Sequence, residues 1–126
     1  MSLKKFFFTG LGVVLILGAY AQPFNKLSVS SLPDIAKATL IPADFNRDGF
    51  VDILITGTTS TELISAVYRN NADTTFFNLG LGLPALDKAA TEVADLDLDG
   101  WPDFMLAGRI DGTIDGYFRI FRRSHN

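Results

Sequence analysis

The sequence predicts an all-β protein in which one small unit of short strands occurs about twice. Three observations support this fold class. Apolar and β-branched runs of four to seven residues alternate with clusters of Gly, Asn, Asp and Ser, a pattern typical of strands and turns. No window after Gln22 keeps the 3.6-residue period of an amphipathic helix. A long block of residues recurs at a constant offset of 51 positions.

The repeat is clearest between residues 43–57 and 94–108, which align without a gap. Acids, glycines and most apolar positions fall in register. Matching residues continue upstream at the same offset: Leu32 with Leu83, Pro33 with Pro84, Lys37 with Lys88 and Ala38 with Ala89. Because the match fills nearly all of the chain after Gln22, we predict two repeat units, at about residues 24–75 and 76–126.

Residues 1–21 have the order of features found in a secretory signal peptide. Lys4 and Lys5 give a positive start, residues 6–18 are almost entirely apolar, and Ala19-Tyr20-Ala21 has the small-x-small pattern of a cleavage site. The apolar run of about 13 residues is shorter than the roughly 20 that span a bilayer. We therefore expect cleavage after this leader and a secreted or cell-surface location.

The chain after the leader is acidic. Two of the eleven Lys and Arg residues are Lys4 and Lys5, so nine basic side chains remain against fourteen acidic ones, a net charge of −5. This balance argues against nucleic acid or an anionic membrane as a partner, because both need a basic surface. Seven of the acids lie within residues 44–52 and 95–103, and the chain has no cysteine to cross-link them. A bound metal ion is the obvious candidate for holding these segments.

The strands of the first unit are expected at residues 38–41, 53–56, 63–69 and 74–77. Residues 57–61 and 70–73 are rich in turn formers and separate them. Residues 24–29 resemble the last strand of a unit. The predicted order along the chain is therefore one fourth strand, one whole unit, and three strands of a second unit.

Oxygen-bearing side chains recur at positions 1, 3, 5 and 9 of two segments between expected strands. They are Asp44, Asn46, Asp48 and Asp52 in the first, and Asp95, Asp97, Asp99 and Asp103 in the second. Gly49 and Gly100 at position 6 permit a sharp turn. Crowded carboxylates repel one another, and calcium, which takes six to eight oxygens in irregular geometry, relieves that repulsion. We predict two calcium sites, with the backbone carbonyls of Phe50 and Trp101 as further ligands.

A simpler explanation is that Asp, Asn and Gly merely favour turns. Two copies in register, each with the same ninth-position acid, favour the metal instead. Position 12 is Ile55 in one segment and Leu106 in the other, whereas an EF-hand needs a bidentate acid there and a helix on each side. The pattern therefore excludes EF-hand and dockerin loops and predicts a calcium hairpin between two strands.

The motif D-x-[DN]-x-D-G-x-x-D, followed by three apolar residues, x and Gly, is similar to the FG-GAP or VCBS repeat, as in the N-terminal β-propeller of integrin α-subunits. Residues 67–71 and 76–77 resemble the next part of that repeat, although Ala72 and Thr74 replace its middle glycines. The resemblance covers about residues 24–123. It implies a β-propeller-type four-stranded blade per unit, with the calcium loop joining the first two strands, and a role in adhesion or ligand display.

Two units are few for such a fold, because propellers usually close with four to eight blades. An open pair leaves sheet faces and edges unpaired. One explanation is a partial protein, with further blades on a longer chain. The other is self-association, in which residues 24–29 of one chain complete the three-stranded unit of another and three chains form a six-bladed ring.

The expected function is that of a non-enzymatic, calcium-stabilised module that binds a protein or a carbohydrate. The alternative is an accessory or truncated part of a larger secreted or cell-surface enzyme or propeller protein. His125 is the only histidine, so no His-dependent triad or zinc site is predicted. We expect Phe50 and Trp101 to pack against a neighbouring unit, and Arg122 and Arg123 to form a solvated strand end.

Overall fold

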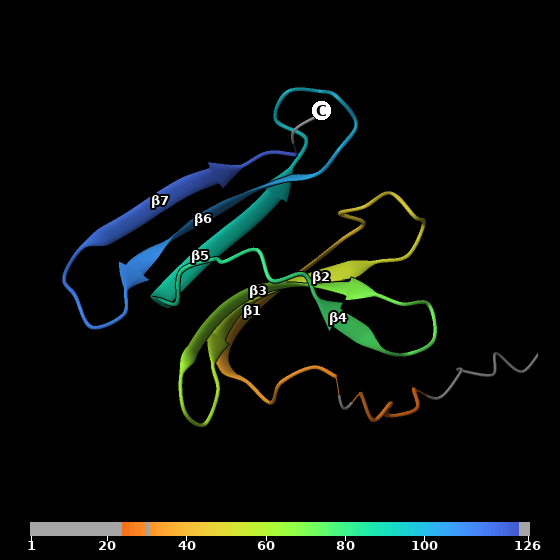
Figure 1. Cartoon of the computed structure of the whole chain (residues 1–126), viewed down its shortest axis with the longest axis horizontal. Helices are drawn as coiled ribbons and strands as arrows, with labels where there is room; N and C mark the ends of the chain where they lie inside the picture. Colours follow the sequence, from red (N-terminus) through yellow and green to blue (C-terminus); the bar gives the residue numbers. More distant parts are fainter. Residues whose placement is uncertain (1–23, 30, 124–126) are drawn as a thin grey trace, which may run out of the picture.

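A computed structural model of the chain describes residues 24–29 and 31–123, which form two antiparallel sheets (Figure 1). The first has the order β1 (Ala36–Ala43), β2 (Asp52–Thr58), β3 (Leu63–Asn70) and β4 (Phe76–Asn78), and the second has the order β5 (Leu86–Ala94), β6 (Asp103–Ile110) and β7 (Gly116–Phe121). The described residues contain no helix, so the all-β prediction is confirmed. The two sheets do not close a ring. The predicted leader, residues 1–21, lies outside the described residues.

Within the described ranges, the structure offers no helix with the length and apolar character needed to cross a bilayer.

All four strands predicted for the first unit are present. β1 and β2 extend beyond their predicted bounds, and β4 is shorter than expected. The second unit repeats the first three strands in the same register. Leu54 pairs with Val67 between β2 and β3, and the residues at the same repeat positions, Met105 and Ile120, pair between β6 and β7. The sequence repeat is therefore a repeat of structure.

The prediction of a strand at residues 24–29 is wrong, because the structure has no strand there. By the repeat, its pairing partner would be the outer edge of β7. The segment lies instead near the first sheet, which contains β1 to β4 (Figure 1). Next to it, the Ser31 hydroxyl accepts a hydrogen bond of 2.8 Å from the Phe76 amide. A lone extended segment gains no ladder hydrogen bonds, and Phe24 and Leu27 stay exposed.

The glycine that ends each repeat motif is required by a bulge in the preceding strand. Lys37 and Lys88 sit in these bulges with positive φ angles of 48° and 52°. A Cβ atom on Gly57 would lie 2.9 Å from that of Ala38, and one on Gly108 would lie 3.0 Å from a side chain of β5. Because a side chain at either position would press against the bulged strand, the bulge and the glycine occur together.

The core lies between the two sheets. Leu54, Val67 and Phe104 are its buried centre, and partly buried residues surround them: Ile41, Phe45, Leu79, Leu83, Val93 and Phe121. The Phe104 ring stacks on Phe121 with centroids 4.6 Å apart and meets Phe45 edge-on at 5.9 Å. The two units therefore share one core, and β5 is the strand of the second unit that lies against the first sheet.

Candidate metal centres

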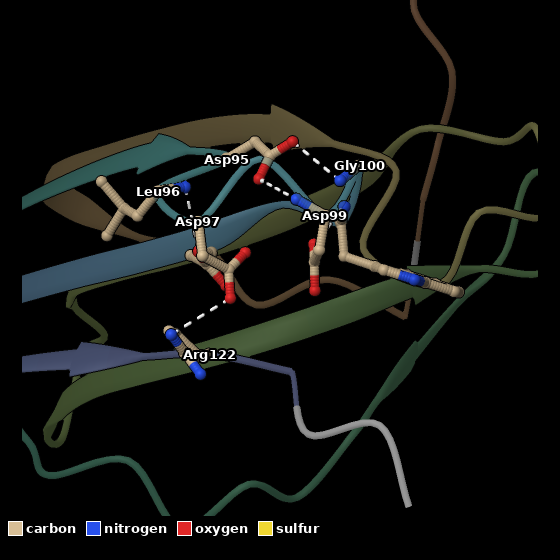
Figure 2. A network of polar contacts seen from close by, with 8 residues as sticks. Asp95, Leu96, Asp97, Asp99, Gly100 and Arg122 are labelled. Atoms are coloured by element: carbon tan, nitrogen blue, oxygen red, sulfur yellow. Dashed lines mark hydrogen bonds and ion pairs between the residues drawn. The ribbon is translucent and has the colours of Figure 1, made fainter.

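The β1–β2 and β5–β6 connections carry the two predicted metal loops, and they have the same hydrogen-bonding pattern. The Asp44 carboxylate accepts the amides of the fifth and sixth loop residues at 3.1 and 2.9 Å. The Asp95 carboxylate accepts the equivalent amides at 3.1 and 2.8 Å (Figure 2). The fifth-position acids, Asp48 and Asp99, each accept the amide two residues later, at 2.9 and 2.8 Å. Each loop is thus wound around its first aspartate.

The backbone turns at two positions in each loop. Gly49 and Gly100 have φ angles of 87° and 85°, as the motif predicts. Position 4 is also left-handed, with φ angles of 56° at Arg47 and 60° at Leu98. The sequence does not signal this second turn, because neither Arg nor Leu favours that conformation. The ring of hydrogen bonds to the first aspartate holds it there.

The ninth-position acids, Asp52 and Asp103, are buried, with 0% and 2% of their surface exposed. Asp52 accepts the Phe45 amide at 3.0 Å and the Asn70 amide at 2.8 Å, one on each oxygen. Asp103 accepts the Leu96 amide at 3.0 Å. Burial raises the pKa of the Asp52 carboxyl, and its two amide hydrogen bonds partly offset this effect. These acids therefore tie each loop to the strands beneath it.

In the second loop, the carboxylates of Asp95, Asp97 and Asp99 gather. One oxygen from each lies within 4.8 Å of the others. Two oxygens bound to the same calcium ion at 2.3–2.6 Å are at most about 5 Å apart, so the set fits calcium. Arg122 Nη1 lies 3.1 Å from Asp97 Oδ2 (Figure 2). Arg122 follows the end of β7 and is exposed, as expected of a solvated strand end, and it also pairs with the loop.

The first loop replaces one of these acids with Asn46. The Asn46 amide donates to Asp48 Oδ2 at 2.7 Å, and its Oδ1 accepts the Asp48 backbone amide at 3.0 Å. The pKa of the Asp48 carboxyl is lowered by the hydrogen bond from the Phe50 amide and then by that from Asn46. The first loop therefore stabilises its fifth-position charge internally, with one negative charge fewer than the second.

The two loops also touch each other. The Arg47 guanidinium of the first loop lies 5.1 Å from the Trp101 ring centre of the second, which confirms that Trp101 packs against the neighbouring unit. Arg123 is exposed, as expected, and it also lies 4.0 Å from the same ring and donates to the Phe45 carbonyl at 3.0 Å. Phe50 does not pack in the same way and is 47% exposed. The position-7 carbonyls of Phe50 and Trp101 stay predicted ligands.

Residues 44–106 match a family model described as an FG-GAP-like repeat. The match begins at the first residue of the first loop and runs past the second, and its 63 residues are half of the 126 in the chain. It confirms the resemblance drawn from the motif. No curated protein and no solved structure matches the chain.

Proposed function

The chain belongs to the FG-GAP-like repeat family, and from this premise we propose that it is a secreted, calcium-stabilised repeat module that binds a ligand and catalyses no reaction. Each sheet is interpreted as a blade of the β-propeller type, the second blade having three strands in this chain. The observation that carries the proposal is the gathering of Asp95, Asp97 and Asp99 oxygens within 4.8 Å.

The chemistry of the donor set supports calcium over softer metals. Every proposed ligand in the two loops is a carboxylate, amide or backbone oxygen, and hard cations prefer oxygen. Calcium also accepts irregular geometry and more than six oxygens, whereas magnesium needs a near-ideal octahedron. In the second loop, Asp95, Asp97, Asp99 and Asp103 would hold the ion with the Trp101 carbonyl. In the first, Asp44, Asn46, Asp48 and Asp52 would hold it with the Phe50 carbonyl.

The role proposed for calcium is structural. Hydrogen bonds to Asp44 and Asp95 shape both loops, so an ion would add to a turn that the backbone amides already define. An ion that binds only the folded loop stabilises it by mass action, by about 2.7 kcal/mol when free calcium is a hundred times the dissociation constant. Calcium therefore takes the place that disulfides have in many exported domains, since this chain has no cysteine.

Export and adhesion rest on the sequence and the family. The leader at residues 1–21 supports secretion or display at the cell surface. The family resemblance supports a protein or carbohydrate ligand, and the acidic balance disfavours nucleic acid. The alternative is a part of a larger secreted enzyme or propeller protein. A longer reading frame that continues the repeats or encodes a hydrolase would favour that alternative.

Calcium titration of the purified chain tests the proposal. We expect isothermal titration calorimetry to show two sites and thermal unfolding to shift upward in millimolar calcium relative to EDTA. Asp95→Ala should remove the second site, because it deletes both a ligand and the acceptor that shapes the loop. Asp111→Ala, in the β6–β7 hairpin, is the matched control and should leave both sites intact. A folded wild-type chain that binds no calcium at millimolar concentration would refute the proposal.

A further inference from the structure

The two units pack against each other, and each uses a different face of its sheet for this contact. The first unit turns Leu54 and Val67 toward the second, and the second turns Phe104 and Phe121 toward the first. In the repeat alignment, however, Leu54 corresponds to Met105 and not to Phe104. We call the side with Leu54 or Met105 the front face of a unit, and the side with Phe104 the back face. The internal contact is front to back.

The front face is covered in one unit and open in the other. In the first unit its residues are Leu54, Thr56, Ser65 and Val67, all buried. In the second unit the same positions are Met105, Ala107, Phe118 and Ile120. Phe118 is 55% exposed and Ile120 is 50% exposed. Among the described residues, the core between the two sheets includes Phe104 and Phe121 of the second unit but none of these four residues.

The back face of the first unit is partly open: Ile55 on β2 and Tyr68 on β3 are buried there, and the exposed residues lie on the edge strand β1. Leu40 on β1 is 53% exposed, its neighbour Pro42 is exposed as well, and Ile53 on β2 is half-buried. By the repeat these positions correspond to Thr91, Val93 and Phe104. Val93 and Phe104 are the residues of β5 and β6 that meet the core. The exposed part of this face is therefore the part that makes the internal contact in the other unit.

The two open faces suit each other at least as well as the two covered ones. The covered pair contains three buried hydroxyls without a hydrogen-bond partner, on Thr56, Ser65 and Thr91. The residues at those positions on the open faces are Ala107, Phe118 and Leu40. An unsatisfied buried hydroxyl costs about 1–3 kcal/mol, and the open pair avoids that cost at all three positions.

We propose that the front face of the second unit docks on the back face of the first unit of another copy of this chain. The contact would repeat the front-to-back packing already present inside the molecule. Because such an interface joins two different surfaces, each chain keeps one front face and one back face available. Association therefore proceeds head to tail, toward a ring or an open array, and calcium occupancy is a separate property.

Two single-face variants test the proposal by sedimentation velocity. Phe118→Asp blocks the front face and Leu40→Asp blocks the back face, and both residues are exposed enough to accept a charge without unfolding. Wild-type chain in millimolar calcium should associate as its concentration rises. Each variant alone should weaken association at least about tenfold, the loss expected for a central interface contact. An equimolar mixture of the two should form a one-to-one complex, because one intact front face and one intact back face remain.

The control is Ile114→Asp in the β6–β7 hairpin, where an apolar residue is 94% exposed but lies on neither face. It should associate like wild type. Ile120→Asp and Pro42→Asp repeat the test at second positions, and circular dichroism verifies folding of every variant. A wild-type chain that stays single at all concentrations, or a mixture that forms no complex, overturns the docking proposal. If calorimetry still shows calcium binding in that case, the proposed function stands and only the docking is wrong.

A gain-of-association variant gives an independent check. Glu92 of the second unit stands at the repeat position of Ile41, which packs against the core. In the docked state its carboxylate would face the apolar residues of another chain. Glu92→Ile should strengthen association several-fold, and unchanged or weaker association would contradict the docking geometry.

Discussion

The two metal loops have nearly identical backbones and balance their charges differently. In the first, the Asn46 amide donates to Asp48 at 2.7 Å, so the contact lies within the loop. In the second, Asp97 is a carboxylate and pairs with Arg122, just after β7, at 3.1 Å. The hydrogen bonds to the first and ninth acids therefore set the shape of the loop. The third residue sets its charge.

The largest expected effect comes from the ninth-position acid. Asp52→Ala would leave the partly buried amides of Phe45 and Asn70 without acceptors, and we expect it to destabilise the fold by about 2–4 kcal/mol. Asp103→Ala should cost less if its hydrogen bond to Leu96 is its main contribution. Urea unfolding in EDTA measures both without any contribution from bound metal. If both substitutions lower the free energy of unfolding by less than Asp111→Ala does, these acids do not stabilise the loops.

The glycines that end the two motifs should be equally intolerant of a side chain. Gly57→Ala and Gly108→Ala each place a methyl group about 3 Å from the bulged strand, and overpacking of this kind costs about 1–3 kcal/mol. Gly116→Ala is the control, since a Cβ atom there meets no neighbour within 4 Å. A large loss at only one of the two motif glycines would show that the bulges differ in rigidity.

The difference at the third position should appear in calcium affinity. We expect the four-aspartate loop to bind about tenfold more tightly than the Asn46 loop, because each added carboxylate strengthens attraction for the ion. Asp97→Asn should weaken the second site toward the first, and Asn46→Asp should strengthen the first toward the second. Calorimetry on both variants separates the two sites. Equal affinities in the wild-type chain would contradict the expected ranking.

The smallest effect concerns the contact between the loops. Arg47→Ala removes the guanidinium that lies over Trp101, and cation–π contacts at exposed sites are worth about 0.5–1 kcal/mol. Arg119→Ala is a matched control, because Arg119 lies 5.3 Å from the Tyr117 ring within a single strand. If Arg47 couples the loops, its loss should also change how calcium at one site affects the other, and the control should not. Identical binding curves would exclude such coupling.

The strands and the loop chemistry follow from local patterns in the sequence. The first acid of each loop reaches amides four and five residues away, and the ninth reaches back seven residues. Interactions over such short sequence separations follow from residue spacing, and the second copy of the motif has the same spacing. The exception is the left-handed backbone at Arg47 and Leu98, which the loop closure imposes on residues that do not favour it.

Other features depend on how the sheets meet. Arg123 and the Phe45 carbonyl are 78 residues apart, and Trp101 meets Arg47 only because the two loops lie side by side. The sequence shows that residues 24–29 resemble a strand, but only the fold decides whether a free sheet edge lies within their reach. Likewise, Leu54 and Met105 occupy the same repeat position, and the arrangement of the two sheets alone decides which is buried. The repeated loops and strands follow from the amino-acid sequence, because residue spacing along the chain controls short-range hydrogen bonds. Which faces, edges and charges find partners depends on the packing of the two sheets, because burial is set by what lies across the interface.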